Sequence, residues 1–207
     1  MKTRLPMYLL CFVLILAVVL AGLGWQEAHD AWPTNEDKTL IKAVLYYESW
    51  LMPFLLPLVV MGFKRQYVSL GMTVFSVIGL VLGIYARFVE PNLLFVKQTQ
   101  INTGYSLKLA LISDMHYGLY STPQQMQRLV AKLNSLNVDA IVVAGDWTYE
   151  PSKKISLTEQ LKPFSQLKYP IYSVPGNHDE EMPGPPLAKE LKAALMANNI
   201  KPIEGQS

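Results

Sequence analysis

The chain has 207 residues, a formal net charge of +2 and 51% hydrophobic residues, and its length allows one or two domains. The small net charge argues against a nucleic-acid partner, which would require a clustered basic face. The single cysteine, Cys11, excludes an internal disulfide and is expected to be a small lipid-facing or packing residue.

Apolar residues dominate the chain up to about residue 90. Residues 7–25 carry no charge and are long enough to cross a bilayer as a helix. This run is longer than the usual apolar region of a signal peptide, and no clean cleavage site follows, so an uncleaved anchor is favoured over a signal peptide. Two further runs, 44–63 and 67–86, complete a predicted three-helix transmembrane anchor over residues 1–90. Kinks are expected at the two prolines of the second run, Pro53 and Pro57.

The charges beside these runs predict an orientation in the membrane. Cations favour the cytoplasmic side of short loops, and they precede the first run and crowd the second loop. The first loop, residues 26–42, is acidic at Glu27, Asp30, Glu36 and Asp37 and suits the outer side, although Lys38 and Lys42 weaken this bias. Three crossings then place everything after Arg87 outside the cytoplasm. The cations that carry this prediction are Lys2, Arg4, Lys64 and Arg65.

After about residue 90 the sequence alternates between strand and helix patterns. Thr122 is a plausible N-cap for a helix that begins at Pro123. Alternation of this kind predicts an α/β fold with a mainly parallel sheet, in which ligands bind at the carboxyl ends of the strands. Strands are expected over residues 92–101 (an edge strand), 107–114 (a buried strand), 139–146, 169–179 and from 201 onward, with helices from 123 onward, over 157–167 and over 187–198.

Three polar clusters stand where apolar strands are predicted to end. Each alone is a weak signal that a simple turn also explains, but their order and spacing make a chance combination rare. Carboxylate, amide and imidazole groups suit Mn, Fe or Zn. Two such ions about 3.5–4 Å apart can bind a phosphate and acidify a water. Glycines would let the backbone pass close to the ions. The clusters are Asp114-Met115-His116, Gly145-Asp146 and Gly176-Asn177-His178-Asp179.

In this order the three clusters resemble the signature of the calcineurin-like metallophosphoesterases. The resemblance covers residues 107–207 and implies a partial α/β metallophosphoesterase sandwich over residues 91–207. The membrane half resembles the membrane-attached bacterial branch of that superfamily. The family therefore implies a membrane-anchored phosphoester hydrolase of the bacterial inner or cytoplasmic membrane, in contact with lipids, with a lipid-linked or cell-envelope phosphoester as substrate.

The resemblance also implies a role for each residue of the clusters. Asp114 and His116 would bind the first of two divalent ions, Asp146 would bridge both, and Asn177 would bind the second. His178 would be catalytic, stabilising the phosphoryl transition state or protonating the leaving group. The ions would be Mn, Fe or Zn.

The chain departs from the family pattern at two points. Tyr149 occupies a position where the family usually has an acid, and either Glu150 or Asp179 could take the role of that acid. The family also has a further histidine and a Gly-His-x-His motif downstream, whereas this chain has only His29, His116 and His178. These departures predict a C-terminally truncated domain with weak or no activity. The alternative is an inactive fragment or a non-catalytic, membrane-bound binding domain.

Overall fold

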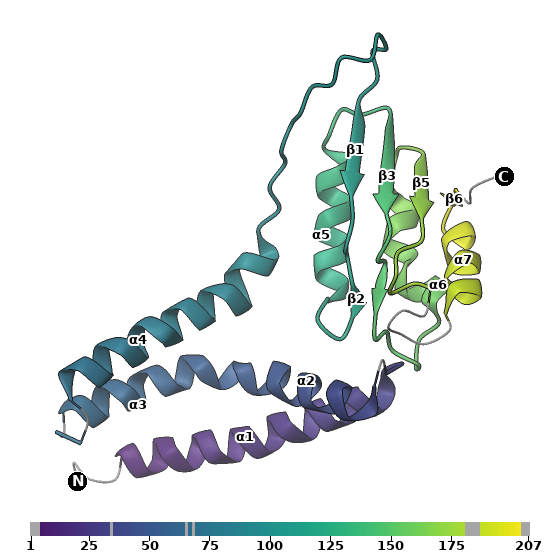
Figure 1. Ribbon diagram of the computed structural model, residues 1–207. Coiled ribbons are helices and arrows are strands. Elements are labelled where there is room, and N and C mark those ends of the chain that lie inside the picture. The colour runs from purple at the N-terminus through teal and green to yellow at the C-terminus, as the bar shows by residue number, and fades with distance from the viewer. Residues whose placement is uncertain (1–4, 34, 65, 68, 181–186, 204–207) are drawn as a thin grey trace. The chain divides into compact units, whose positions relative to one another are not determined.

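The computed structural model describes residues 5–33, 35–64, 66–67, 69–180 and 187–203 (Figure 1). Three of the cations behind the predicted orientation, Lys2, Arg4 and Arg65, lie outside these residues. The chain divides into two compact units. The first comprises Met1–Gln26 and Leu40–Leu93, and the second comprises Glu27–Thr39 and Leu94–Ser207. A division at residue 90 remains a prediction, but nothing in the sequence pattern indicates that Glu27–Thr39 groups with the second unit.

The first unit is helical, and the predicted apolar helices are present. Within the part of the chain that the structure describes, three stretches are long and apolar enough to cross a membrane: Met7–Asp30, Glu36–Lys64 and Leu70–Asn92. Each is longer than predicted because polar turns extend it. The second begins at Glu36 because Asn35 caps it and two acids occupy its first turn. The elements are α1 (Leu5–Asp30), α2 (Glu36–Glu48), η1 (Ser49–Leu51), α3 (Met52–Lys64), α4 (Leu70–Ile84), η2 (Tyr85–Val89) and η3 (Glu90–Asn92).

A change of helix type separates α2 from α3. Pro53 has no N–H, and its ring conflicts with the carbonyl group of Ser49, four residues earlier. The chain therefore turns through the 3-10 segment η1 at this point. Arg87 reinforces the break, because its guanidinium lies 3.8 Å from the centre of the Tyr46 ring and donates a hydrogen bond of 2.8 Å to Ser49.

The second unit is built on a parallel sheet, as predicted. Its four strands run in the order β1-β3-β5-β6, and a separate parallel pair joins β2 to β4. The strands are β1 (Leu109–Ile112), β2 (Tyr117–Gly118), β3 (Ala140–Ala144), β4 (Thr148–Tyr149), β5 (Ile171–Val174) and β6 (Ile200–Pro202). The helical elements between them are α5 (Pro123–Asn134), α6 (Leu157–Gln160), η4 (Lys162–Gln166) and α7 (Ala188–Ala197).

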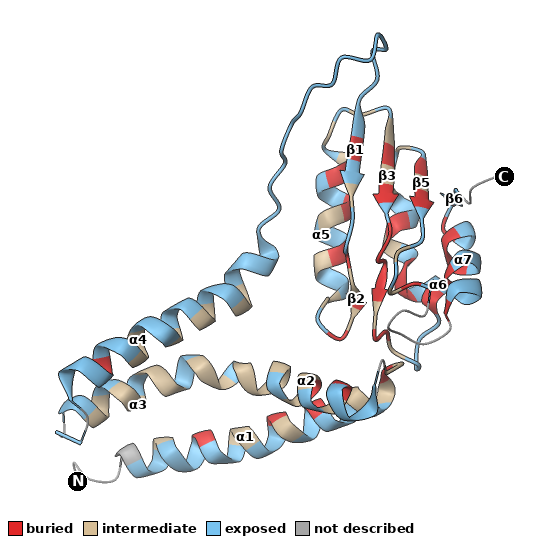
Figure 2. Ribbon diagram, in the orientation of Figure 1, coloured by how far each residue is buried: buried red, intermediate tan, exposed pale blue. Residues whose placement is uncertain are grey.

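The core lies between one face of this sheet and the helices. Ile141 and Val143 on β3 are fully buried, and they alternate with residues of the opposite face. Figure 2 shows the buried residues on the strands and on α5, α6 and α7. The opposite face is open at β1, where Leu109 and Leu111 are 50% and 70% exposed. The strand predicted at residues 107–114 is present as β1, but its predicted burial is wrong, because β1 is an edge strand with one open face.

Two other predicted elements differ from the structure. No helix or strand forms between Leu93 and Lys108, so the expected edge strand over residues 92–101 is wrong. Those residues are exposed and have no strand beside them, and an alternating pattern cannot form a strand without a partner. The expected helix over residues 157–167 ends at Gln160, because Pro163 cannot donate to the helical hydrogen bonds, and the chain continues as η4. By contrast, α5 begins as predicted, with Thr122 and Gln125 forming a capping box.

Candidate metal centre

The three polar clusters meet at the carboxyl end of the sheet, as the order of the strands predicts. The N–H of Asp114, after β1, donates to the carbonyl of Gly145, after β3, over 3.3 Å. The N–H of His116 donates to the carbonyl of Asp146 over 3.0 Å. After β5, the N–H of His178 donates to the Asp146 carboxylate over 3.1 Å. Asp146 is thus bonded to both neighbouring loops.

The side chains at this point are spaced for a shared cation. Nε2 of His116 lies 3.7 Å from Oδ1 of Asp114 and 3.9 Å from Oδ2 of Asp146. These distances are too long for hydrogen bonds. Two atoms that each bind one ion at about 2.0–2.2 Å are separated by about 3–4 Å. One ligand atom from each of His116, Asp146 and His178 lies within 4.8 Å of the others. The donor set and spacing therefore fit a divalent ion.

Exposure distinguishes the members of the site. The side chain of Asp146 is 12% exposed, whereas that of Asp114 is 65% exposed and stands at the rim. The Nδ1 atom of His116 is buried and has no hydrogen-bond partner among the described residues. Asn177 is exposed and directly precedes His178. The centre of the site is therefore formed by Asp146 and the two imidazoles.

The backbone of the site is held in an unusual conformation. Asp114, His116 and Asp146 have φ values of 53°, 43° and 53°, a left-handed region that residues with a side chain seldom occupy. Such conformations persist when surrounding contacts impose them, and they are concentrated at functional sites. The hydrogen bonds between the loops supply such contacts here.

Two glycines allow the β3 and β5 loops to approach each other. A Cβ atom on Gly145, whose φ is 82°, would lie 2.6 Å from the Cα of Gly176. A Cβ atom on Gly176 would lie 2.0 Å from Oδ1 of Asp146. No side chain fits at either position without moving the backbone or the Asp146 carboxylate. The close approach expected for these glycines is therefore made to each other and to Asp146.

Asp179 connects the same two loops. Its buried carboxylate accepts hydrogen bonds from the N–H groups of Trp147 at 3.1 Å, Thr148 at 3.2 Å and Gly176 at 2.9 Å. Burial raises the pKa of this carboxyl; the hydrogen bonds from Gly176, Trp147 and Thr148 lower it, and the nearby Asp146 raises it further. Asp179 thus acts on the backbone of the loops. Sequence reasoning offered it only as a replacement for the acid missing at position 149.

Tyr149 itself belongs to the site. Its ring centre lies 5.5 Å from that of His116 and 5.0 Å from that of His178, with both imidazoles nearly perpendicular to it. The ring of Tyr120 stacks on that of Tyr149, with ring centres 6.0 Å apart. The sequence marked Tyr149 only as a departure from a pattern, and Tyr120 carried no signal at all. Glu150, the other proposed replacement for the acid, accepts a hydrogen bond from Thr39.

The second unit is thus an α/β domain with a candidate metal centre at the carboxyl end of a parallel sheet. Residues 107–205 match the sequence profile of the calcineurin-like phosphoesterases, so this part of the chain carries a calcineurin-like phosphoesterase domain.

The chain is also similar to several described proteins. It is 37% identical over 122 residues to a transmembrane protein with metallophosphoesterase domain from Danio rerio, covering 57% of this chain and 27% of the relative. It is 33% identical over 106 residues to the UDP-2,3-diacylglucosamine pyrophosphatase LpxG of Chlamydia trachomatis, covering 46% and 31%. An uncharacterized metallophosphoesterase of Helicobacter pylori is 29% identical over 102 residues, covering 47% and 26%.

The coverage and the sources of these relatives limit what the similarity implies for this chain. The chain spans only 26–31% of their length. They include an animal protein as well as bacterial ones, so the match does not select a bacterial branch. No solved structure shows a significant match to this chain.

Proposed function

We propose that the chain carries part of the metal centre of a phosphoester hydrolase that is held at a membrane by three helices. The observation that carries this proposal is the grouping of His116, Asp146 and His178, whose ligand atoms lie within 4.8 Å of one another. They stand at the carboxyl end of a parallel sheet, the edge at which such sheets bind ligands. The family match supplies the reaction class.

Asp114, His116, Asp146 and Asn177 are the proposed ligands of two divalent ions, Mn, Fe or Zn. Asp146 suits the bridging position because it is buried between the other two loops and its carboxylate faces His116. When bound, such ions neutralise phosphate oxygens and lower the pKa of a bound water. The chain has three histidines, and two of them reach the site, so two complete coordination shells need further ligands. We therefore expect this chain alone to bind metal weakly and to turn over slowly.

The role proposed for His178 is to stabilise the phosphoryl group or to protonate the leaving-group oxygen. The geometry also allows a second role. Its ligand atom lies within 4.8 Å of those of His116 and Asp146, so a small movement of the side chain would let it bind the same ion. The two roles differ in what the side chain contacts, and the metal content of a His178 variant separates them.

The proposed substrate is a lipid-linked or cell-envelope phosphoester. Two observations support this class: three helices suited to a membrane, and a relative named as a pyrophosphatase of a diacylated sugar nucleotide. The second candidate function is a non-catalytic, membrane-bound metal-binding domain. It is favoured by the small number of imidazoles at the site.

Metal analysis and hydrolysis of an activated aryl phosphodiester by the full chain test the proposal. Asp146→Asn should abolish the metal bound by the wild type, because the bridging carboxylate is lost. Asp139→Asn is the matched control: this exposed aspartate precedes the same strand at its opposite end. His178→Ala should keep its metal, and its rate of hydrolysis should fall by a factor of about 10²–10⁴, which is the usual contribution of one general acid or electrostatic donor.

The control variants distinguish the two roles of His178 and the two candidate functions. His29→Ala, a change at the remaining histidine of the chain, should leave metal content unchanged. Loss of metal in His178→Ala equal to that in Asp146→Asn would make His178 a ligand. Equal metal content in Asp146→Asn and Asp139→Asn would overturn the site. Metal binding with no hydrolysis in any condition would favour the binding domain.

A further inference from the structure

The segment Glu27–Thr39, called here the interhelical segment, connects the first two apolar helices and groups with the second unit. Its backbone is bonded to the chain that follows β4. Ala31 and Ser152 form an antiparallel bridge, the N–H of Trp32 donates to Pro151 over 2.8 Å, and the N–H of Lys153 donates to Asp30 over 2.6 Å. These bonds run in both directions, as between two short strands.

Side chains extend this contact into the core. Trp32 packs against the hydrophobic core of the second unit, and Ala31 is 2% exposed. The Lys153 ammonium lies 5.6 Å from the centre of the Trp32 ring, and Lys154 forms an ion pair with Asp30. A loop that only joined two membrane helices would need none of these contacts. The interhelical segment is therefore a structural part of the unit that holds the candidate metal centre.

A buried polar pair lies at the end of the interhelical segment. The Thr39 hydroxyl donates a hydrogen bond of 2.7 Å to Oε1 of Glu150, and the two residues are 1% and 2% exposed. Glu150 has a φ of 50°, in the left-handed region. A buried carboxylate and a strained backbone both require specific partners to persist, and Thr39 supplies one.

Glu150 of this buried pair is the next residue in the chain after a residue of the site. Glu150 directly follows Tyr149, whose ring packs on the imidazoles of His116 and His178. Tyr149 is the last residue of β4 and pairs with Gly118 of β2. The strand is only two residues long, so the position of the Tyr149 ring depends on what holds the chain after it.

We propose that the interhelical segment is an integral part of the domain, and that Thr39 and Glu150 are positioning residues that hold Tyr149 against the two site histidines. The segment thereby couples the connection between two apolar helices to the geometry of the site. This inference stands on the contacts alone and does not require the proposed hydrolysis.

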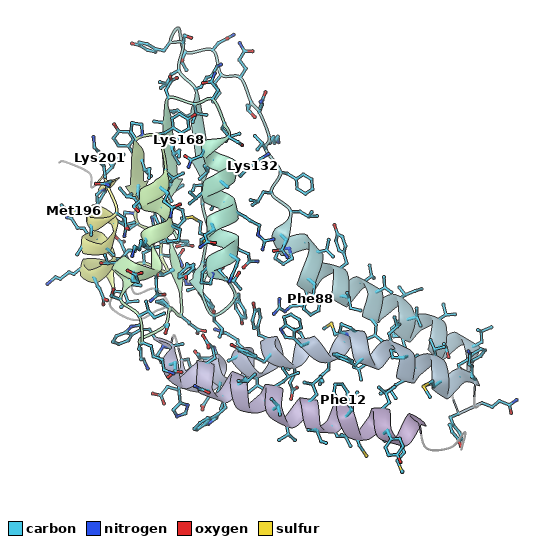
Figure 3. The ribbon with its side chains drawn as sticks, turned by 180° about the vertical axis from the view of Figure 1, so that it is seen from behind. Phe12, Phe88, Lys132, Lys168, Met196 and Lys201 are labelled. Carbon is cyan, nitrogen blue, oxygen red and sulfur yellow. The ribbon has the colours of Figure 1, made fainter. Side chains whose placement is uncertain are left out.

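Disulfide formation in the full chain tests the docking. In a Cys11→Ala background, Ala31→Cys with Ser152→Cys should form a disulfide on mild oxidation of membranes, because bridged residues have the Cα separation that a disulfide needs. Ala31→Cys with Lys168→Cys is the control: Lys168 precedes β5, at the end of the sheet opposite to the site (Figure 3). Equal yields for the two pairs, or no disulfide in either, would overturn the docking.

Histidine ring NMR of the full chain in detergent micelles tests the positioning. The chain has three histidines, so ring-labelled protein gives few signals, and His116→Ala and His178→Ala assign two of them. Thr39→Val, which loses the hydroxyl at constant shape, should shift the His116 and His178 signals toward their positions in Tyr149→Leu. Thr39→Ser should restore the wild-type spectrum. A Thr39→Val spectrum identical to the wild type would overturn the positioning role, whatever the chain's metal content or activity.

Discussion

Asp179 holds two loops of the site although it contributes no atom to the proposed metal ligands. Its carboxylate accepts hydrogen bonds from three backbone N–H groups. Burying any of these N–H groups without an acceptor would destabilise the folded chain. These hydrogen bonds fix the backbone that directly follows Asp146 and the backbone of the loop after β5. The position of Asp146 therefore depends on a neighbouring acid that does not face the ion.

Asp179→Asn should destabilise the chain, because an amide has one acceptor oxygen where the carboxylate has two. The expected loss is about 1–3 kcal/mol, the cost of an unsatisfied buried polar group. Chemical denaturation of the chain in detergent micelles measures it. Asp139→Asn, at an exposed aspartate that accepts one backbone hydrogen bond, from Lys108, should change stability less, and equal losses in both would contradict the anchoring role.

The pH dependence of this loss has a definite sign. Burial raises the pKa of Asp179, so the folded chain binds this proton more tightly than the unfolded chain. The resulting stabilisation is complete below the usual carboxyl pKa of about 4 and is lost as pH rises through the raised value. The difference in free energy of unfolding between the wild type and Asp179→Asn should therefore become smaller as pH rises from about 4. A difference that widens would contradict the direction of the shift.

Residues whose chemistry is carried by a motif could be predicted, and residues that act through packing could not. The convergence of Asp114, His116 and Asp146 follows from their place after parallel strands. Tyr149 contacts both site imidazoles, but a single aromatic residue in a two-residue strand has no sequence pattern that predicts such a contact. The sequence offers Glu150 as one of two replacement acids, a role that stays a prediction. Its hydrogen-bond partner Thr39 lies 111 positions away in the chain, and no local pattern connects them.

At the scale of whole elements, periodicity identified the strands β1, β3 and β5 and the helix α5, but it did not give their surroundings. The apolar run at β1 predicts burial on both faces, as is usual for parallel strands. In the structure β1 is an edge strand, and its outward residues are exposed. Which face is covered depends on what packs there, and the strand's own sequence does not contain that information.

A pair of leucine truncations tests this difference between faces. Leu133→Ala, on the buried side of α5 at 3% exposure, should cost about 2–5 kcal/mol. Leu111→Ala, on the open face of β1 at 70% exposure, should change stability by no more than about 0.5 kcal/mol. Denaturation of the full chain measures both. An equal loss at the two positions would show that the open face is covered.

For the molecule as a whole, the docked interhelical segment constrains the membrane topology. Ala31 and Ser152 are in contact, so they must lie on the same side of any membrane that the chain crosses. An even number of crossings must therefore separate them. The two candidate spans between them, Glu36–Lys64 and Leu70–Asn92, satisfy this requirement. The contact does not say which side the domain occupies, and that choice rests on the cations beside the spans.

Single cysteines in a Cys11→Ala background determine both the number of crossings and the orientation. Lys38→Cys in the interhelical segment and Lys168→Cys in the domain replace exposed lysines, and Tyr67→Cys replaces a residue that is 80% exposed between α3 and α4. If cationic loops face the cytoplasm, a membrane-impermeant maleimide should label positions 38 and 168 in intact bacterial cells. Position 67 should react only after permeabilisation, because it adjoins Lys64 and Arg65. The reverse pattern would place the domain in the cytoplasm while keeping the three crossings. If positions 38 and 168 were labelled differently, both the docked segment and the three crossings would be contradicted. Two residues of one compact unit cannot lie on opposite sides of a bilayer.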